Sequence, residues 1–238
     1  MFNMGVDSAK GKWLTIGLSE SEIYEVRLFN TIGEIWDRYN GAELILIDIP
    51  IGIRESGSEG RICDIMAHRL LGPRRSSVFR VPCRATLEAT NYDDAKIINK
   101  AKTGKSLAIQ SWSIIPKIRE LDEFLNKNIS SRSKIREIHP EVCFYALNGG
   151  KPMEFNKKKA EGFQERIKVL RRVCDYTDKV IQLAKSELYG KVADDDILDA
   201  LVAAVTAHLG NGRFMTLPER PETDARGLPM EMVYYPRS

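Results

Sequence analysis

The sequence predicts an α/β protein with a mixed five-stranded sheet flanked by helices, in a single domain over residues 1–238. Short strand-like runs joined by brief polar turns open the chain, and a continuous apolar run follows at residues 44–47. An alanine-rich segment with helical periodicity spans residues 195–209. Unbroken apolar runs are typical of strands covered on both faces, and a helix that is apolar around most of its circumference packs against a sheet.

The composition is that of an ordinary globular protein. Of 238 residues, 43% are hydrophobic and 29% are charged, and the formal net charge is only +3, so a polyanionic partner would have to be held by a local basic patch. The longest strongly apolar run is too short to cross a bilayer, and no basic leader precedes an apolar stretch near Met1. The four scattered cysteines predict reduced thiols. We expect a cytoplasmic protein without a membrane partner.

Four strands are predicted within the first fifty residues. They are expected at residues 2–7, 13–18, 23–29 and 44–47. The first three are separated by polar turns of four or five residues, a spacing that predicts consecutive hairpins and therefore three antiparallel strands. A short helix is expected over residues 31–39, and Pro50 and Gly52 end the fourth strand.

The pattern becomes mainly helical between about residues 60 and 130, which predicts an insertion between the fourth and fifth strands. Residues 61–71 carry apolar side chains at helical spacing, and a loop rich in proline and arginine follows at 72–84. Pro116 is expected in the first turn of a further helix, because proline is favoured there. The apolar stripe of that helix comprises Ile118, Leu121, Phe124 and Leu125.

The fifth strand is expected at residues 134–138, and helices follow it. Apolar stripes at 163–170 and 180–188 predict two helices, and the alanine-rich helix comes last. The tail at about 211–238 holds several prolines and is expected to be irregular.

Two aspartates stand where predicted strands end. Asp7 closes the first strand and Asp48 closes the fourth. Carboxylates at strand ends lie at the rim of a sheet, where sites on α/β scaffolds form. The alternative is that each aspartate only caps the turn after it. That explanation is weaker for the two residues together than for either one alone.

A third acidic group opens the last helix. Acidic residues favour helix N-termini, so part of this group needs no functional explanation. Asp199, however, lies beyond the cap on the same face as Asp195 and Asp196, and stacked carboxylates repel unless a cation lies between them. Carboxylate oxygens suit Mg²⁺ or Mn²⁺. The predicted catalytic and metal-binding residues are therefore Asp7, Asp48, Asp196 and Asp199. Asp195 is a further candidate ligand.

These acids, with the Asp-x-x-Asp-Ala-Leu pattern of the last helix, resemble the RNase H superfamily, and the helix is most similar to that of the Holliday-junction resolvase branch. More closely, the chain resembles a family catalogued as predicted nucleases of the RNase H fold (domain of unknown function 429). The matching stretches are Gly5-Val6-Asp7-x-Ala9, Asp48-x-Pro50-x-Gly52, Arg61-x-Cys63-Asp64, Ser76-Ser77-Val78-Phe79, Gly104-Lys105-Ser106-Leu107 and His139-Pro140-Glu141, besides the last helix.

The resemblance implies hydrolysis of nucleic-acid phosphodiester bonds, with a pair of Mg²⁺ or Mn²⁺ ions as cofactor. It implies DNA or RNA as the partner, and resolvase-like proteins often act as homodimers. The resolvase-like pattern carries a glutamate at the end of the fourth strand, where this chain has Asp48. A shorter side chain at that position changes the geometry of the expected site.

Other residues are candidates for supporting roles. Glu141 is a further candidate metal ligand and His139 a candidate proton shuttle. The alternative is a turn that Pro140 fixes and that these side chains cap. Guanidinium and ammonium groups bind phosphate, although a solvated basic loop is the ordinary alternative. The candidate phosphate- or nucleic-acid-binding residues are Arg74, Arg75, Arg80, Arg84 and Lys105.

Two other functions remain open at this point. The first is a catalytically inactive nucleic-acid- or phosphate-binding protein of the same fold. The second is a nucleotide-binding enzyme of the actin and sugar-kinase type, a class that needs glycine-rich phosphate loops after its strands. The segment from Asp7 to Lys12 is a poor version of such a loop.

Overall fold

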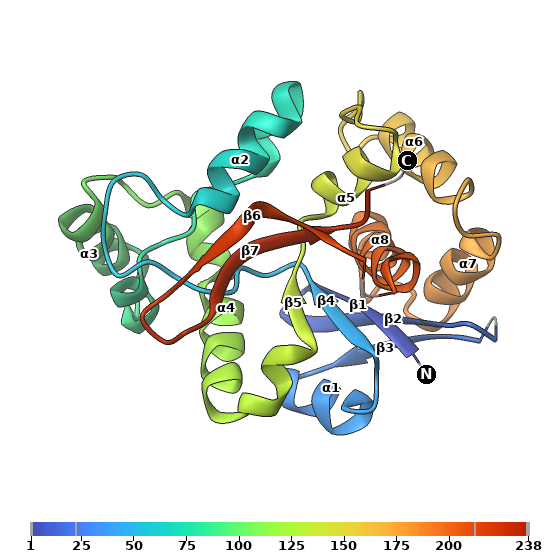
Figure 1. The fold of residues 1–238 in the computed structure, drawn as a ribbon, viewed down its shortest axis with the longest axis horizontal. Helices are drawn as coiled ribbons and strands as arrows, with labels where there is room; N and C mark the ends of the chain where they lie inside the picture. The colour runs from blue at the N-terminus through green and yellow to red at the C-terminus, as the bar shows by residue number, and fades with distance from the viewer. Residues whose placement is uncertain (1, 22, 212, 237–238) are drawn as a thin grey trace.

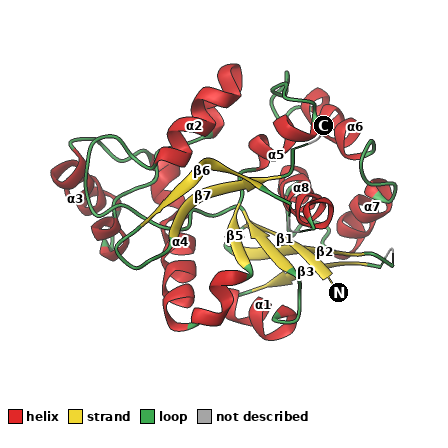
Figure 2. Ribbon diagram, viewed as in Figure 1, coloured by secondary structure: helices red, strands yellow, loops and turns green. Residues whose placement is uncertain are grey.

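The computed structural model describes residues 2–21, 23–211 and 213–236. The strands of its main sheet are β1 (Phe2–Ala9), β2 (Lys12–Ser19), β3 (Tyr24–Phe29), β4 (Leu44–Ile47) and β5 (Ile135–Glu137). The sheet order is β3-β2-β1-β4-β5; the first three strands are antiparallel, and β4 and β5 run parallel to β1. Helices flank this sheet (Figures 1 and 2). The predicted mixed five-stranded sheet is confirmed, and it is consistent with an RNase H-like fold.

The turn between β1 and β2 contains only Lys10 and Gly11. Both have a positive φ, 48° and 80°. Two-residue hairpin turns of this kind match the twist of the strands that they join, and glycine adopts the conformation at no steric cost. The turn sets Ala9 opposite Lys12 and therefore Asp7 opposite Leu14.

Alternation along β1 and β4 decides which side chains face the functional side of the sheet. One face presents Met4, Val6, Ile45 and Ile47, which belong to one hydrophobic cluster. Side chains of a strand point alternately to opposite faces. The other face therefore presents Gly5, Asp7, Leu46 and Asp48. The backbone N–H of Asp48 donates to Val6 O at 2.9 Å, which ties that aspartate to β1 directly after β4 ends.

The helix α8 (Asp194–Gly210) covers the face that carries both aspartates. It lies so close to β1 that a Cβ built on Gly5 would be 2.0 Å from Ala200 O and 2.3 Å from Ala204 N. Glycine is therefore required there for contact between the two backbones. The layer is completed by α5 (Pro140–Leu147), α6 (Ala160–Leu170) and α7 (Thr177–Glu187). The opposite face is covered by α1 (Ile32–Tyr39) and α4 (Ile109–Lys127).

The segment between β4 and β5 is mainly helical. It holds α2 (Ile62–Leu71), α3 (Tyr92–Thr103), α4 and the 3₁₀ helices Gly72–Ser77, Arg84–Glu88 and Ile129–Ser133. The expected start of a helix near Pro116 is wrong, because α4 begins at Ile109 and Pro116 lies inside it. Proline removes a helical hydrogen bond at that point. The buried side chains Ser111 and Ile115 lie before the proline on the packed face of the helix, so packing holds the helix together across the proline.

The irregular tail expected after residue 211 is also wrong. The structure has two antiparallel strands there, β6 (Met215–Thr223) and β7 (Pro229–Tyr234), with a register shift between Leu217 and Glu222. Prolines occur in strands that leave backbone groups unpaired, and this sheet has only two strands. The hairpin lies between the main sheet and α2 (Figure 1). Met230 and Met232 are buried in a cluster with Cys63 and Leu71 of α2.

Replacing Gly5 by alanine should strongly destabilise the fold, because the added methyl group would overlap the α8 backbone. The expected loss is about 3 kcal/mol or more of unfolding free energy, at the upper end for overpacking. Urea denaturation followed by circular dichroism measures it. Gly41→Ala is the matched control, since nothing lies within 4 Å of a Cβ at Gly41. Equal stability of the two variants would contradict the close contact.

Candidate metal centre

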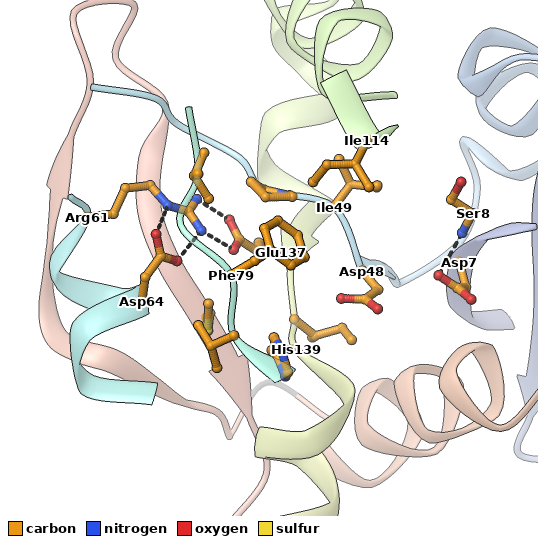
Figure 3. Close-up of a pocket in the computed structure, with 15 residues that line it drawn as sticks. Asp7, Ser8, Asp48, Ile49, Arg61, Asp64, Phe79, Ile114, Glu137 and His139 are labelled. Carbon is orange, nitrogen blue, oxygen red and sulfur yellow. Dashed lines mark hydrogen bonds and ion pairs between the residues drawn. The ribbon is translucent and has the colours of Figure 1, made fainter. Parts of the chain in front are cut away.

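Asp7, Asp48 and Asp199 come together from three separate elements. Asp7 is on β1, Asp48 follows β4, and Asp199 is in the second turn of α8. Alternation points the first two toward α8, and the contact at Gly5 brings Asp199 down onto them. Figure 3 shows Asp7 and Asp48 on neighbouring segments, and the Oδ1 of Asp7 accepts a hydrogen bond from Ser8 N at 2.7 Å. The sequence therefore identified three acids that the fold assembles at one place.

Two of these carboxylates are buried, Asp48 is half-buried, and the three repel one another. The side chains of Asp7 and Asp199 belong to residues only 7% and 2% exposed. Burial raises the pKa of Asp7 well above its ordinary value, and the charges of Asp48 and Asp199 raise it further. The pKa of Asp48 is likewise raised, first by burial and then by Asp199. A cluster of this kind holds a cation or a proton more readily than separate aspartates do.

Lys157 provides a positive charge within the cluster. It comes from the loop between α5 and α6, and its Nζ contacts Asp199 Oδ2. Burial alone would lower the pKa of Lys157, but Asp199, Asp48 and Asp7 outweigh that effect and raise it. Sequence reasoning missed this residue. The only available signal was the run of three lysines at positions 157–159, which reads as a solvated loop.

Two buried carboxylate oxygens in this region lack a donor among the described residues. They are Asp199 Oδ1 and Glu141 Oε2. The other oxygen of Glu141 accepts from Arg166, with N–O distances of 3.1 and 2.5 Å. Unpaired buried oxygens cost free energy unless a ligand satisfies them, and carboxylate oxygens suit hard divalent cations. The donor set therefore fits Mg²⁺ or Mn²⁺. Glu141 belongs to α5, which begins at Pro140. The alternative expectation for this position, a turn fixed by Pro140, is therefore replaced by the first turn of a helix.

The remaining predicted acids lie at the start of α8. Asp196 Oδ2 accepts from the backbone N–H of Ala193 at 2.9 Å, which is a capping contact. Burial also raises the pKa of Asp196, and Asp195 and Asp199 add to that rise. Asp195 is half-buried and lines a hollow with Lys157. Asp196 thus caps the N-terminus of α8 and is also close enough to Asp199 for the two carboxylates to repel each other.

A second acidic group lies beyond Asp48. Candidate ligand atoms of Cys63, Asp64 and Glu137 are within 4.8 Å of one another, a spacing compatible with a metal ion. Arg61 already donates to both carboxylates, at 2.6 and 3.0 Å to Asp64 and 2.7 Å to each oxygen of Glu137 (Figure 3). Burial raises the pKa of Cys63, so its thiol stays protonated. Arg61 thus balances charge that a metal would otherwise balance.

Two hollows open beside Asp48. A small one of about 160 Å³ reaches from Asp7 and Asp48 to Asp64 and Glu137. A larger one of about 500 Å³ is lined by Asp48, Arg74, Ser77 and Lys157, among others. Asp48 therefore borders a hollow on two sides and Asp7 on one.

His139 lines both hollows. Its Nε2 lies 3.3 Å from Ser77 O, so that nitrogen carries the proton, because a carbonyl oxygen only accepts. Its Nδ1 is buried and has no partner within the described residues. Burial lowers the pKa of His139, which keeps the ring neutral near pH 7. His139 is therefore a neutral ring that shares both hollows with Asp48.

The five predicted phosphate-binding residues do not form one patch. Arg74 lines the larger hollow, whereas Arg80 lines a neighbouring hollow beyond Phe79. Arg75 and Lys105 are exposed. Arg84 corrects the expectation most clearly, because it is buried and donates to both oxygens of Asp122 at 2.9 Å and to Asp224. Its guanidinium is saturated by carboxylates and ties the insertion to the β6–β7 hairpin.

Comparison with known proteins gives one match. A family model described as "Protein of unknown function (DUF429)" matches residues 5–223, most of the chain. No curated protein and no solved structure matches. Among the described residues, no helix is both long and apolar enough to span a membrane.

The metal-free protein should lose stability as pH rises. The raised pKa values of Asp7, Asp48 and Asp199 mean that the folded chain binds protons more tightly than the unfolded chain. The stability that these three protonated carboxyl groups add to the fold is fully present below pH 3.8, the ordinary pKa of an aspartate. It is lost as pH rises through their raised pKa values. Thermal unfolding in EDTA between pH 5 and about 8 measures this, and Asp199→Asn should flatten the dependence.

Adding Mn²⁺ near pH 8 should raise the wild-type Tm and leave that of Asp199→Asn nearly unchanged, because a ligand that binds the folded state stabilises it. An equal Tm increase in both proteins would place the ion elsewhere.

Proposed function

This chain belongs to the family of proteins of unknown function DUF429, and we propose that it is a metal-dependent nuclease that hydrolyses phosphodiester bonds of nucleic acid. The observation that carries the proposal is the convergence of Asp7, Asp48 and Asp199. They come from three elements, they are desolvated together, and one buried oxygen of Asp199 has no donor among the described residues. Separate turn-capping roles do not account for that convergence.

The position of the site in the fold supports the proposal. The acids stand two residues before the end of β1, directly after β4 and on the last long helix, which is close to where the resemblance to the RNase H superfamily places its catalytic carboxylates. The two-residue turn at Lys10 and Gly11 leaves no glycine-rich loop after β1. That turn favours a hydrolase over a nucleotide-binding enzyme of the actin and sugar-kinase type.

Asp7, Asp48 and Asp199 would hold the cation, with Asp196 and Glu141 beside them. A bound Mg²⁺ or Mn²⁺, or a pair of such ions, would supply Lewis-acid activation of water and stabilisation of the leaving oxygen. The mutual repulsion of the carboxylates is then balanced, and Lys157 is free to contact another anion.

The larger hollow provides groups for the substrate. Arg74 makes no ion pair with the described residues, and it lines that hollow with Lys158 and the serine hydroxyls of Ser76 and Ser77. Guanidinium, ammonium and hydroxyl groups bind phosphate oxygens. Neutral His139 lines the same hollow and would be the proton shuttle beside the phosphate.

The decisive test combines metal binding with cleavage. We expect calorimetry to detect Mn²⁺ binding to the wild type and its loss in Asp7→Asn and Asp199→Asn. Cleavage of a panel of single-stranded, duplex and branched DNA and RNA should require the metal. It should fall at least about 100-fold in both variants, because each removes an oxygen ligand.

Asp194→Asn is the matched control, since Asp194 is on the same helix and pairs with Lys185 at the surface. Metal binding without cleavage of any panel member would favour the inactive binding protein. Absence of metal binding by the wild type would refute the proposal.

Alanine substitutions of Arg74 and Arg84 should affect different properties, oligonucleotide binding in the first case and stability in the second. Arg74→Ala should keep the wild-type Tm and lower the slope of log K against log salt for oligonucleotide binding by about 1, the loss of one phosphate contact. Arg84→Ala should lower the unfolding free energy by about 3 kcal/mol, the lower end for a broken buried pair, because Asp224 loses its guanidinium whereas Asp122 keeps Arg226. Lys127→Ala is the control, because that side chain is 76% exposed and distant in the chain from both residues. If the slope of log K against log salt is the same in Arg74→Ala as in the wild type, Arg74 does not contact a substrate phosphate.

A further inference from the structure

Phe79 lies where three hollows meet. It lines the small hollow beside Asp48, the larger hollow that contains Arg74, and a third hollow that contains Arg69 and Arg80. Its ring is half-buried, yet it packs into none of the three hydrophobic clusters found among the described residues. An aromatic ring without a place in the core and with basic side chains on both sides is the arrangement on which nucleobases stack.

The small hollow, here called the slot, has the size and lining of an aromatic-ring site. It encloses about 160 Å³. An apolar cavity of about 150 Å³ in another protein holds one benzene molecule. Its apolar wall consists of Ile49, Val78, Phe79, Val81, Ile114 and Met232. Asp7 and Asp48 stand at one end of it (Figure 3).

The polar groups of the slot suit an uncharged ring with hydrogen-bonding edges. At the end far from Asp48, the carboxylates of Asp64 and Glu137 are both held by Arg61, so neither is a free anion. His139 also lines the slot, as a ring that its lowered pKa keeps neutral. Nucleobases are flat, largely apolar rings with hydrogen-bonding edges, which a lining of this kind accommodates.

We infer that the slot takes one unpaired nucleobase, stacked on Phe79, from the strand whose phosphate reaches Asp7 and Asp48. The inference rests on the proposed function and names its substrate class. A base inside a duplex cannot enter a pocket of this size without leaving its partner. The substrate is therefore single-stranded DNA or RNA, or an unpaired nucleotide at a loop, end or junction.

Fluorescence anisotropy tests this with three labelled oligonucleotides of equal length. They are a single strand, the same strand in a duplex, and a single strand of abasic units, each prepared as DNA and, where possible, RNA. Ca²⁺ replaces Mg²⁺ as the hard cation, and a gel confirms that the strands stay intact. Wild type should bind the base-bearing single strand most tightly.

The variants separate stacking from backbone binding. Phe79→Ala should weaken binding of the base-bearing strand by roughly 5- to 150-fold, the range for loss of one stacked base. Its affinity for the abasic strand should not change. Phe79→Trp should retain binding, and Ile114→Trp should weaken it by filling the slot. Tyr189→Ala is the control, because Tyr189 is 88% exposed and lines none of the three hollows.

Equal wild-type affinity for base-bearing and abasic strands, or unchanged binding by Phe79→Ala, overturns the inference. If Phe79→Ala does not fold, Ile114→Trp decides in the same way. Mn²⁺ calorimetry on the same proteins keeps the two proposals apart. Intact metal binding and cleavage without base preference would refute only the slot. Absent metal binding in the wild type would refute the nuclease proposal and leave any Phe79-dependent base binding standing.

Discussion

Carboxylates that are withdrawn from water and placed beside one another raise the free energy of a folded chain unless a positive charge balances them. Here that arrangement follows from the contact between α8 and β1. Gly5 lets the two backbones touch, and the touching backbones set Asp199 over Asp7 and Asp48. This contact depends on the strand order and on the tight turn at Lys10 and Gly11. It also depends on the apolar faces of α8, which pack against the sheet. Lys157 supplies the positive charge from a loop outside the sheet.

Buried arginines position the parts of the chain that surround the carboxylates. Arg61 connects the start of α2 to Glu137 on β5, and Arg166 connects α6 to Glu141 on α5. Within the insertion, Arg84 joins the 3₁₀ helix Arg84–Glu88 to α4, and it also joins the insertion to the β6–β7 hairpin. A buried ion pair adds little net stability, but leaving one partner alone is costly, so such pairs select one arrangement over others. The loop with Phe79 lies between Arg61 and Arg84 and is held at both ends.

Most of the central sheet could be predicted from sequence, because its strands are contiguous apolar runs and its turns are short. Asp7, Asp48 and Asp199 could be predicted for the same reason, since their positions relative to strand and helix ends are local information. The expectations for Pro116, Arg84 and the C-terminal tail failed because each is decided by distant partners. Ile115 and Ser111 carry α4 past its proline, and Asp122 and Asp224 neutralise Arg84.

Sequence patterns did not indicate Lys157, and they indicated Phe79 only within the family-matching stretch at residues 76–79, without a role for the ring. Lys157 is one of three consecutive lysines, and only the fold shows which of them enters the carboxylate cluster. Phe79 follows a typical loop sequence, and its surroundings come from α2, α4, β5 and β7. Pattern reasoning locates groups attached to regular elements, whereas groups on long loops are placed by tertiary contacts.

The C-terminal hairpin has a consequence for the order in which the molecule matures. Asp224, between β6 and β7, accepts hydrogen bonds from Ile53 N at 3.0 Å and from Arg84. Ile53 and Asp224 are 171 positions apart in the chain, and contacts of such separation form late because a long loop must close first. Arg84 can already pair with Asp122 before Asp224 is in place, so the hairpin completes the anchoring of the segment that carries Phe79. Strand β7 also supplies Met232 to the wall of the small hollow beside Phe79, so that wall is complete only after the hairpin has folded back onto α2.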